Sequence, residues 1–325
     1  MPRPNAARAA LLMVLALLLG TACGGAAGSA GGDPATTPAA PSPSPSASAD
    51  AFPVTIAAAN GDVTVEARPE AIVSLSPTAT EMLFAIGAGD QTVAADSFSN
   101  HPPEAPTTDL SALEPNVEAI AGYGPDLVVY ADDAGDLDAA LAELGVPALS
   151  LPAAATLDDT YDQIDQLGTA TGHGDGADEV VGRMRAEIDE IVAGAPSPDP
   201  AASFYHELDD TLYTVTSDTF IGQLYGMLGL SNIADAAPDD AGAYPQLSSE
   251  FVVDANPSMI FLADTVCCGQ SAETVAQRPG WERIAAVEDG AVIELDDDVA
   301  SRWGPRVVDL LRTIADAVAA DAGGA

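Results

Sequence analysis

Short apolar runs alternate with amphipathic segments from about residue 52 to residue 320. Runs of Val, Ile, Leu and Ala bounded by Pro, Gly or Ser are typical of strands buried on both faces of a sheet. The first half has such runs at 71–75, 92–95, 127–130 and 148–151, with helical patterns at 81–86, 117–121 and 137–144. The second half has strand patterns at 204–207, 212–215, 259–262 and 291–295, with helical patterns at 220–228, 251–254 and from 305 onward. Alternating strands and helices predict parallel sheets covered on both faces, an α/β fold.

A longer amphipathic segment lies between the two halves. Residues 177–193 carry apolar side chains at helical spacing, from Val180 to Val192. A helix of that length is about 25 Å long, enough to run from one lobe to another. A surface helix within one domain would show the same pattern, but its place between two α/β halves favours a bridge. We expect an N-terminal lobe at 52–172, a bridging helix at 173–196 and a C-terminal lobe at 197–320, with a ligand cleft between the lobes.

The first 51 residues have a different character. Two arginines precede an apolar run of 11 residues, Ala9–Leu19, which suits a signal-peptide core and is too short to span a bilayer. The run ends in Leu19-Gly20-Thr21-Ala22-Cys23, which resembles the signal of bacterial lipoproteins. We expect residues 1–22 to be a lipoprotein signal peptide, Cys23 to receive the lipid, and the Pro-, Ser-, Ala- and Gly-rich residues 23–51 to be a disordered tether. The alternative is a plain secretory signal cleaved before an incidental cysteine.

Composition limits the classes of function. The chain has 50 acidic residues against 10 basic ones, all arginine, and a formal net charge of −40. Such a surface repels phosphate backbones and anionic headgroups, which argues against nucleic-acid binding and a polybasic membrane patch. Three cysteines, two of them adjacent, make no disulfide framework, and neither C-x-x-C nor HExxH occurs. Since the only histidines are His101, His173 and His206, we expect no three-histidine metal site.

The two halves share a spaced motif. Glu118 stands fourteen residues before Asp132, and Glu250 stands fourteen before Asp264, with a proline at the seventh position in both. Each glutamate begins a short helix that leads into a buried strand. The repeat predicts a pseudo-symmetric pair of exposed glutamates, one in each lobe. Their alternative role is to stabilise the helix N-termini through the helix dipole.

Several stretches, in the same order along the chain, resemble the substrate-binding proteins of ABC importers for iron complexes and vitamin B12. They are Ile72-Val73-Ser74-Leu75-Ser76-Pro77-Thr78-Ala79-Thr80-Glu81, Ser99-Asn100-His101-Pro102-Pro103-Glu104, Pro125-Asp126-Leu127-Val128 and Tyr244-Pro245-Gln246-Leu247-Ser248-Ser249-Glu250. Within that family the likeness is greatest to the members that bind vitamin B12, and it covers nearly all of residues 65–318. The resemblance implies two Rossmann-like lobes with parallel sheets, joined by one long rigid helix, and a ligand cleft between them.

The resemblance also implies a function and partners. A protein of this kind captures a metal chelate outside the cell and delivers it to an importer, and it is not an enzyme. The implied partners are a dimeric ABC permease and, through it, the ATPase. Glu118 and Glu250 match the glutamates that dock into arginine pockets on the two permease subunits. We expect a monomer without a cofactor of its own, held by its lipid anchor at the outer face of the cytoplasmic membrane.

Open α/β sheets bind ligands where their strands end, so the loops at those ends should line the cleft. The residues expected there are Ser76, Pro77, Thr78, His101, Tyr130, Tyr205, Tyr244, Arg302 and Trp303. Tyr244 matches a tryptophan of the members that bind vitamin B12, whereas Ala112 and Ala131 stand where other aromatic contacts are found. His101 has the alternative of a solvated turn residue. Arg302, beside a tryptophan, suits a ligand carboxylate or propionate.

The ligand and one rival activity stay open at this point. Aromatic faces suit a large, nearly neutral chelate, and the acidic surface disfavours anionic ferric catecholates. We rank a cobalamin-like corrinoid first, a neutral or cationic ferric hydroxamate siderophore second, and haem third. A secreted serine hydrolase, with Ser76 as nucleophile, His101 as base and Asp132 as the acid, is the alternative from another class, although no G-x-S-x-G motif occurs.

Two adjacent cysteines, Cys267 and Cys268, follow a predicted strand. In an oxidising compartment they could form a vicinal disulfide, since Cys23 is taken by the lipid. Such a disulfide strains the backbone. A pair of buried thiols is therefore an equal alternative.

Overall fold

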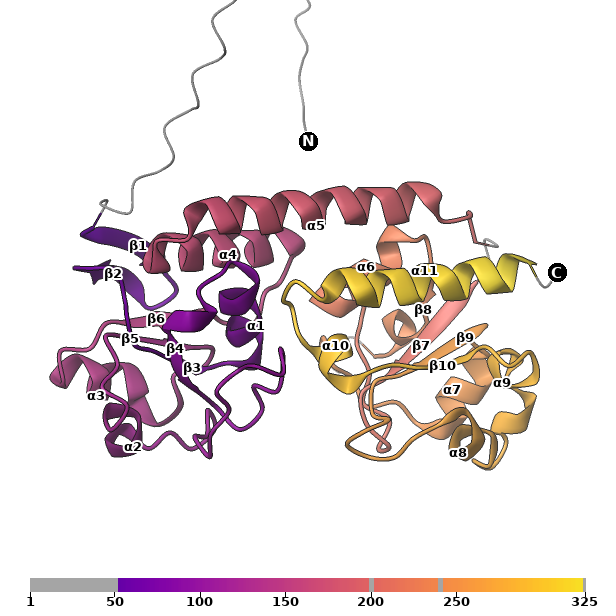
Figure 1. Ribbon diagram of the computed structural model, residues 1–325. Coiled ribbons are helices and arrows are strands. Elements are labelled where there is room, and N and C mark those ends of the chain that lie inside the picture. The colour runs from indigo at the N-terminus through magenta and orange to yellow at the C-terminus, as the bar shows by residue number, and fades with distance from the viewer. Residues whose placement is uncertain (1–51, 199–201, 239–241, 324–325) are drawn as a thin grey trace, which may run out of the picture. The chain divides into compact units, whose positions relative to one another are not determined.

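The computed structural model describes residues 52–198, 202–238 and 242–323, which contain two four-stranded parallel sheets (Figure 1). The first has the order β4-β3-β5-β6 and the second the order β10-β9-β7-β8. Their strands are β3 (Ile72–Leu75), β4 (Thr92–Ala95), β5 (Leu127–Tyr130), β6 (Ala148–Ser150), β7 (Ser203–Glu207), β8 (Ser231–Asn232), β9 (Met259–Leu262) and β10 (Val292–Glu294). In both sheets the first strand lies between the second and the third, with the fourth beyond the third. Two lobes with one topology confirm the predicted α/β fold.

The prediction of a strand at 212–215 was wrong. The chain turns directly after β7, where Leu212 adopts a positive φ of 71° and its N–H donates to the carbonyl of Asp209. The following segment then pairs outside the sheet, with residues 243–247. The second strand of this sheet is instead β8, two polar residues that carry no hydrophobic pattern.

The N-terminal lobe holds four α-helices and an antiparallel hairpin. These are α1 (Pro77–Ala85), α2 (Val117–Ala121), α3 (Leu137–Glu143) and α4 (Leu157–Thr171), with hairpin strands β1 (Val54–Ala58) and β2 (Gly61–Val65) and 3₁₀ turns η1 (Gly89–Gln91) and η2 (Ala134–Asp136). Polar side chains cap the helices: Asn116 accepts from the third residue of α2, and Thr156 forms a capping box with Asp159 at the start of α4.

A helix of 21 residues, α5 (Gly174–Gly194), leads from this lobe to the second. The second lobe holds α6 (Phe220–Met227), α7 (Ser249–Ala255), α8 (Ala272–Ala276), α9 (Ala285–Glu288), α10 (Asp297–Ser301), α11 (Val307–Gly323) and 3₁₀ turns η3 (Ile233–Ala236) and η5 (Trp281–Arg283). The limits predicted for the lobes and the bridging segment, 52–172, 173–196 and 197–320, stay a prediction.

One apolar cluster runs through both lobes. It contains the buried faces of α1, α4, α5, α6 and α11, from Met82 in the first lobe to Phe204 and Leu311 in the second. Figure 1 shows α5 and α11 above the sheets, while α2 and α3 cover the opposite face of the first sheet and α7 to α9 that of the second. A continuous core of this kind opposes large hinge movements, because opening it would expose apolar surface.

No helix in the described ranges is long and apolar enough to cross a membrane. The predicted signal peptide at 1–22, the lipid-bearing Cys23 and the tether at 23–51 lie outside those ranges.

Candidate functional site

In each sheet the strand order reverses beside the first strand, and ligands bind outside such a switch point. In the first lobe the chain passes from β3 straight into α1. Ser76 caps this helix, since its Oγ accepts a hydrogen bond from the N–H of Ala79 (3.2 Å), and Pro77 lies in the first turn. Ser76 and Thr78 are only 2% and 3% exposed. The three predicted residues therefore begin a helix and offer little surface to a ligand.

A network of hydroxyl groups fills this first switch point. Thr80 Oγ1 donates to Ser74 Oγ (2.9 Å) and lies 2.8 Å from Ser99 Oγ, which donates to the carboxylate of Asp96 (2.7 Å). All four side chains are buried, and burial raises the pKa of Asp96. The network fixes the loop after β4 against α1.

Ionisable side chains occupy the same place in the second lobe. Glu207, the last residue of β7, is fully buried and receives two hydrogen bonds from Arg278 (2.5 and 2.6 Å). Asp264, two residues after β9, is also fully buried, and no donor in the described part of the chain reaches either of its oxygens. Burial, with the nearby charge of Glu207, raises the pKa of Asp264 to about 7. A proton on Asp264 lets it donate a hydrogen bond to Glu207.

Glu81 in α1 connects the first lobe to the segment between α10 and α11. Its carboxylate accepts one hydrogen bond from Arg302 (2.7 Å) and two from Arg306 (2.6 and 2.9 Å). Arg302 also donates to the carbonyl of Phe98 (2.9 Å) and pairs with Asp298 (2.7 Å), and it is buried. The structure thus gives Arg302 a different role from the predicted one. Its guanidinium joins the lobes and is already satisfied by protein groups.

Trp303 and His101 lie next to this connection. The indole N–H of Trp303 donates to Gln163 of α4 (2.9 Å), and the ring packs against the core shared by the lobes. His101 borders a pocket of about 270 Å³ together with Pro305 and Arg306. Both Trp303 and His101 are partly exposed and stay candidates for ligand contact.

The three predicted tyrosines have different surroundings. Tyr130 and Tyr205 are 1% and 0% exposed, and their rings lie in the apolar clusters of their lobes. Burial raises the pKa of both, that of Tyr130 to about 12. A ligand could reach them only after these cores had rearranged. Tyr244, in contrast, is 54% exposed.

Tyr244 stands on an irregular antiparallel pair. Residues 243–247 bond to residues 212–216 through backbone hydrogen bonds of 3.0 Å. Tyr213, on the partner segment, is 42% exposed. The pair therefore presents two tyrosines at the surface of the second lobe.

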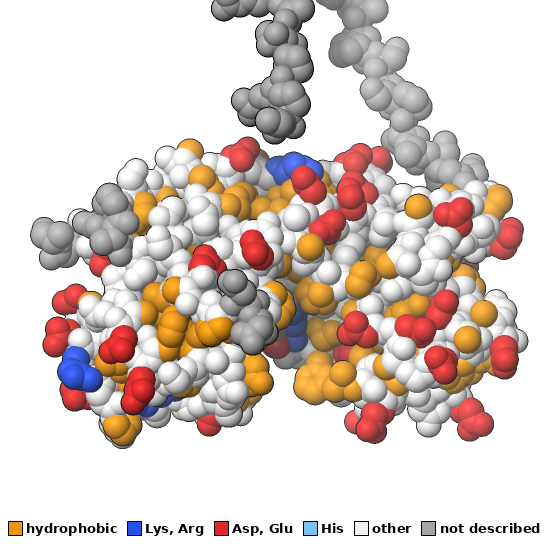
Figure 2. Space-filling model, turned by 180° about the vertical axis from the view of Figure 1, so that it is seen from behind, with side chains coloured by type: hydrophobic (Ala, Val, Ile, Leu, Met, Phe, Trp, Pro, Cys, Tyr) orange, Lys and Arg blue, Asp and Glu red, His pale blue; other side chains and the backbone are white. Residues whose placement is uncertain are grey.

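Sequence reasoning missed other large apolar side chains in these loops. Phe98 and Leu113, after β4, are 62% and 75% exposed, and Val266, after β9, is 77% exposed. Large apolar groups that gather at one surface mark binding sites. Figure 2 shows the surface hollowed between the lobes, with hydrophobic side chains on both walls. The sequence did hold one indication of this surface: Phe98 is an aromatic residue in a polar loop, between two serines.

Hydrogen bonds tie the two walls to the start of α10. Asp298 accepts from Asn100 of the first lobe (2.7 Å), two residues from Phe98. Its neighbour Asp297 accepts from the N–H groups of Val266 (3.0 Å) and Cys267 (2.7 Å). Consecutive residues of one short helix therefore hold the loops that carry the exposed apolar groups.

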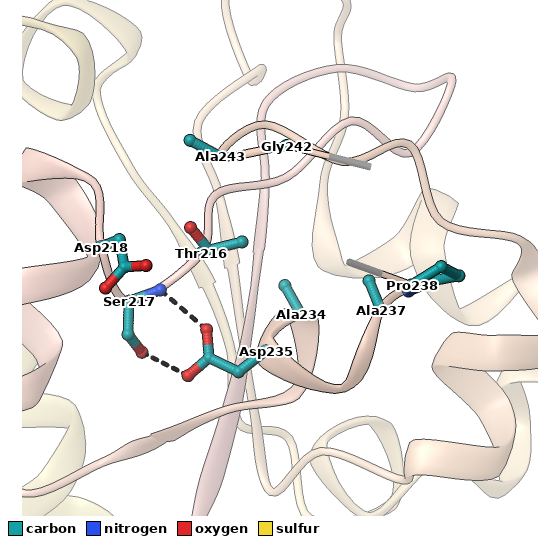
Figure 3. Close-up of a pocket in the computed structure, with 9 residues that line it drawn as sticks. All are labelled: Thr216, Ser217, Asp218, Ala234, Asp235, Ala237, Pro238, Gly242 and Ala243. Atoms are coloured by element: carbon teal, nitrogen blue, oxygen red, sulfur yellow. Dashed lines mark hydrogen bonds between the residues drawn. The ribbon is translucent and has the colours of Figure 1, made fainter. Parts of the chain in front are cut away.

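A second pocket, of about 410 Å³, lies in the second lobe (Figure 3). Figure 3 shows mostly short side chains around it, and Ser217 donates to Asp235 through both its N–H (2.8 Å) and its Oγ (2.7 Å). Ala243, the neighbour of Tyr244, also lines this pocket. Thr216 and Ala243, which both line the pocket, belong to the two paired segments that carry the tyrosines.

The adjacent cysteines match neither of the two expectations. Cys267 and Cys268 are free thiols and both are exposed. The hydrogen bond with Cys268, with smaller contributions from desolvation and Asp297, raises the pKa of Cys267 to about 12.

The three histidines lie in separate surroundings and make different contacts. His173 bonds Arg68 (2.8 Å), and buried His206 bonds Tyr225 (2.7 Å) in the core, where burial lowers the pKa of His206 to about 4. No group of three or more His, Cys, Asp or Glu among the described residues could hold a metal ion. The hydrolase assignment finds no support either, since Ser76 is engaged as a helix cap.

Residues 72–299 match the family described as Periplasmic binding protein. The chain belongs to this family. It is 32% identical over 282 residues to the uncharacterized ABC transporter substrate-binding lipoprotein YvrC of Bacillus subtilis, covering 84% of this chain and 87% of the relative. It is 30% identical to the cobalamin-binding protein of Halobacterium salinarum, covering 83% and 75%. The periplasmic heme-binding protein RhuT from Roseiflexus sp. RS-1 aligns with a TM-score of 0.66 at 25% identity, covering 78% of this chain and 99% of that one.

A periplasmic binding protein of this kind works with an ABC permease and its ATPase. The two repeated glutamates are both exposed, in the first turns of their helices, Glu118 in α2 and Glu250 in α7. Figure 1 shows both helices on the side of the sheets away from α5. The two charges therefore lie on one side of this binding protein, one on each lobe.

Proposed function

We propose that this binding protein captures a metal chelate between its lobes and delivers it to an ABC permease, with a cobalamin-like corrinoid as the first candidate. The observation that carries the proposal is the exposure of Phe98, Tyr213, Tyr244 and Val266, which follow strands of both sheets or pair with the segment after β7. Flat aromatic faces gain contact area on a large macrocycle and tolerate its polar edges. The 30% identity to a cobalamin-binding relative supports the same ligand class.

Charge decides the order of the other candidates. A net charge of −40 disfavours the approach of strongly anionic ferric catecholates. A neutral or cationic ferric hydroxamate avoids that penalty and ranks second. Haem ranks third, with partly exposed His101 and the exposed tyrosines as its available axial ligands.

The docking surface is the second part of the proposal. Two carboxylates on a two-lobed body suit a permease dimer that offers an arginine pocket on each subunit. Charge pairs of this type fix orientation and rate of association more than affinity. Glu118 and Glu250 take this role because they are exposed and occupy equivalent places in the two lobes.

The anchor is the third part. Cys23 carries a lipid that holds a monomer at the outer face of the cytoplasmic membrane, a placement that the lipoprotein name of one relative supports. Cys23→Ala should move the protein from the membrane fraction to the soluble fraction and leave chelate binding unchanged. A variant that stays in the membrane fraction would contradict the lipid anchor.

Calorimetric titration tests the ligand. The purified protein is titrated with cyanocobalamin, a ferric hydroxamate, haem and, as the disfavoured class, a ferric catecholate. We expect a dissociation constant below about 1 μM, or about −8 kcal/mol, for at least one of the first two. Tight binding of the catecholate alone would overturn the electrostatic argument, and binding of none of the four would overturn the chelate proposal.

A further inference from the structure

Cys267 and Cys268 have an unusual setting for cysteines. Cysteine is among the residues most often buried in proteins, yet both of these are exposed. They are consecutive in the chain, so both thiols belong to one short loop. They also follow exposed Val266 at the carboxyl end of β9, the edge where the proposed ligand site lies. Two neighbouring thiols at this edge form a group of soft ligand atoms.

The loop that carries the thiols is held in place. The carboxylate of Asp297 accepts hydrogen bonds from Thr265 Oγ1 (3.1 Å) and from the N–H groups of Val266 and Cys267. The N–H of Cys268 donates to the carbonyl of Asp264 (3.3 Å). Ligand atoms held by such supporting hydrogen bonds bind a metal with less loss of conformational freedom.

The loop is also tied to the opposite wall of the site. Asp297 is followed by Asp298, which pairs with Arg302, and Arg302 donates to the carbonyl of Phe98 in the first lobe. The thiols are thus connected through α10 to the loop that carries Phe98. The thiol loop therefore belongs to the second-lobe wall of the proposed site.

We propose that this thiol pair supplies a direct ligand to the metal of the bound chelate, and that the chelate it selects is a corrinoid with an exchangeable axial water. This inference rests on the proposed function. A cysteine sulfur displaces the water from cobalt(III) and forms a cobalt–thiolate bond. The thiol proton passes to solvent, and no electron is transferred. A corrinoid whose axial position holds cyanide exchanges that ligand slowly, and a ferric hydroxamate has no open position, so neither gains this bond.

The test compares aquocobalamin with cyanocobalamin on the full chain carrying Cys23→Ser, reduced before use, so that Cys267 and Cys268 are its only thiols. We expect aquocobalamin to show the altered visible spectrum of a thiolate adduct and to release one proton per bound molecule. Its affinity should exceed that of cyanocobalamin by about tenfold or more. Cyanocobalamin should bind without a spectral change.

The matched variant is the double replacement Cys267→Ser with Cys268→Ser, which keeps size and polarity at two exposed positions. It should lose the spectral change and the preference for aquocobalamin while cyanocobalamin affinity stays unchanged. One contrary result is that the parent protein binds cyanocobalamin while the spectrum of aquocobalamin stays unchanged. That result would overturn the thiolate ligand and leave the proposed function intact. A spectral change that persists in the double variant would assign the bond to another residue. Failure of both corrinoids to bind would overturn the corrinoid and the thiolate ligand together.

Discussion

The two switch points have the same topology and different contents. In the first lobe the hydroxyl groups of Ser74, Thr80 and Ser99, together with the one buried carboxyl group of Asp96, fill the end of the sheet. In the second lobe the equivalent place holds Glu207 and Asp264, with an arginine beside them. The repeated sequence motif therefore specifies a helix and a strand in each lobe, but the side chains at the carboxyl end of the sheet differ between the two lobes.

Asp132 and Asp264 show the divergence most directly. Both stand fourteen residues after an exposed glutamate, yet Asp132 is exposed and Asp264 has no exposed surface. The cause is the chain that follows. After Asp264 the loop folds back, and the N–H groups of Cys268 and Gln270 donate to its carbonyl (3.3 Å each). The second lobe thus buries Glu207 and Asp264, while Val266, two residues further along the chain, stays exposed.

Removing Arg278, the half-buried cation that pairs with buried Glu207, should have the largest effect on stability. Arg278→Gln leaves Glu207 buried without its charge partner, which should lower the free energy of unfolding by about 3–5 kcal/mol. Urea denaturation measures the change. Arg185→Gln is the matched control, because Arg185 is 54% exposed in its pair with Asp158 and lies over an aromatic ring as Arg278 does. The control should cost under about 1 kcal/mol, and equal losses in both variants would refute the contrast.

The pH dependence of stability should separate the two aspartates. Asp264 has its folded pKa raised from 3.8 to about 7, so the folded state holds a proton that the unfolded chain releases. Its contribution is fully present below about pH 4 and is lost as pH rises through 7, at up to about 1.4 kcal/mol per pH unit. Asp264→Asn, which mimics the protonated side chain, should remove this slope and exceed the parent in stability above pH 7.

The control for this experiment is Asp132→Asn. Its carboxylate is exposed, so this replacement should change the free energy of unfolding by no more than about 0.5 kcal/mol. A stability difference between Asp264→Asn and the parent that does not change with pH would mean that Asp264 is ionised in the folded protein.

The smallest predicted effect is on the affinity for the chelate. Tyr244→Ala should weaken chelate binding by about 1–3 kcal/mol in the calorimetric titration, as for an aromatic anchor that a ligand covers. Tyr123 is also exposed, at 42%, but it precedes β5 and lies away from the carboxyl end of the sheet. Tyr123→Ala should leave the affinity unchanged. Equal losses would place the ligand elsewhere or point to a general effect on folding.

The sequence predicted the parts of the fold whose pattern is local. Strands β5 and β9 are uninterrupted apolar runs, β3 is apolar except for Ser74, and α11 has a regular apolar stripe. Helix α4 was missed because ten of its fifteen residues are Asp, Gln, Thr or Gly, so that its apolar spacing is sparse. Strand β8 was missed because two polar residues give no period at all.

The site was less predictable because its contacts are distant in sequence. Arg302 donates a hydrogen bond to Glu81, 221 residues away, and no residue close to Arg302 in the sequence indicates that partner. Tyr130 and Tyr205 lie in strands, where the choice between core and cleft depends on packing that a short pattern does not encode. Tyr244 was expected in the cleft because it matches a tryptophan of the family members that bind vitamin B12, and the structure leaves it 54% exposed.

The most direct test of the transport role is the ATPase activity of the matching permease complex in lipid vesicles, measured with chelate-loaded binding protein. The double variant Glu118→Arg with Glu250→Arg should bind the chelate as the parent does and fail to stimulate ATP hydrolysis, because each change replaces an attractive charge with a repulsive one. The matched control, Glu143→Arg with Asp254→Arg, changes the net charge equally at exposed acids on α3 and α7 and should stimulate normally. Full stimulation by the Glu118 and Glu250 variant would contradict the account of docking through one glutamate on each lobe.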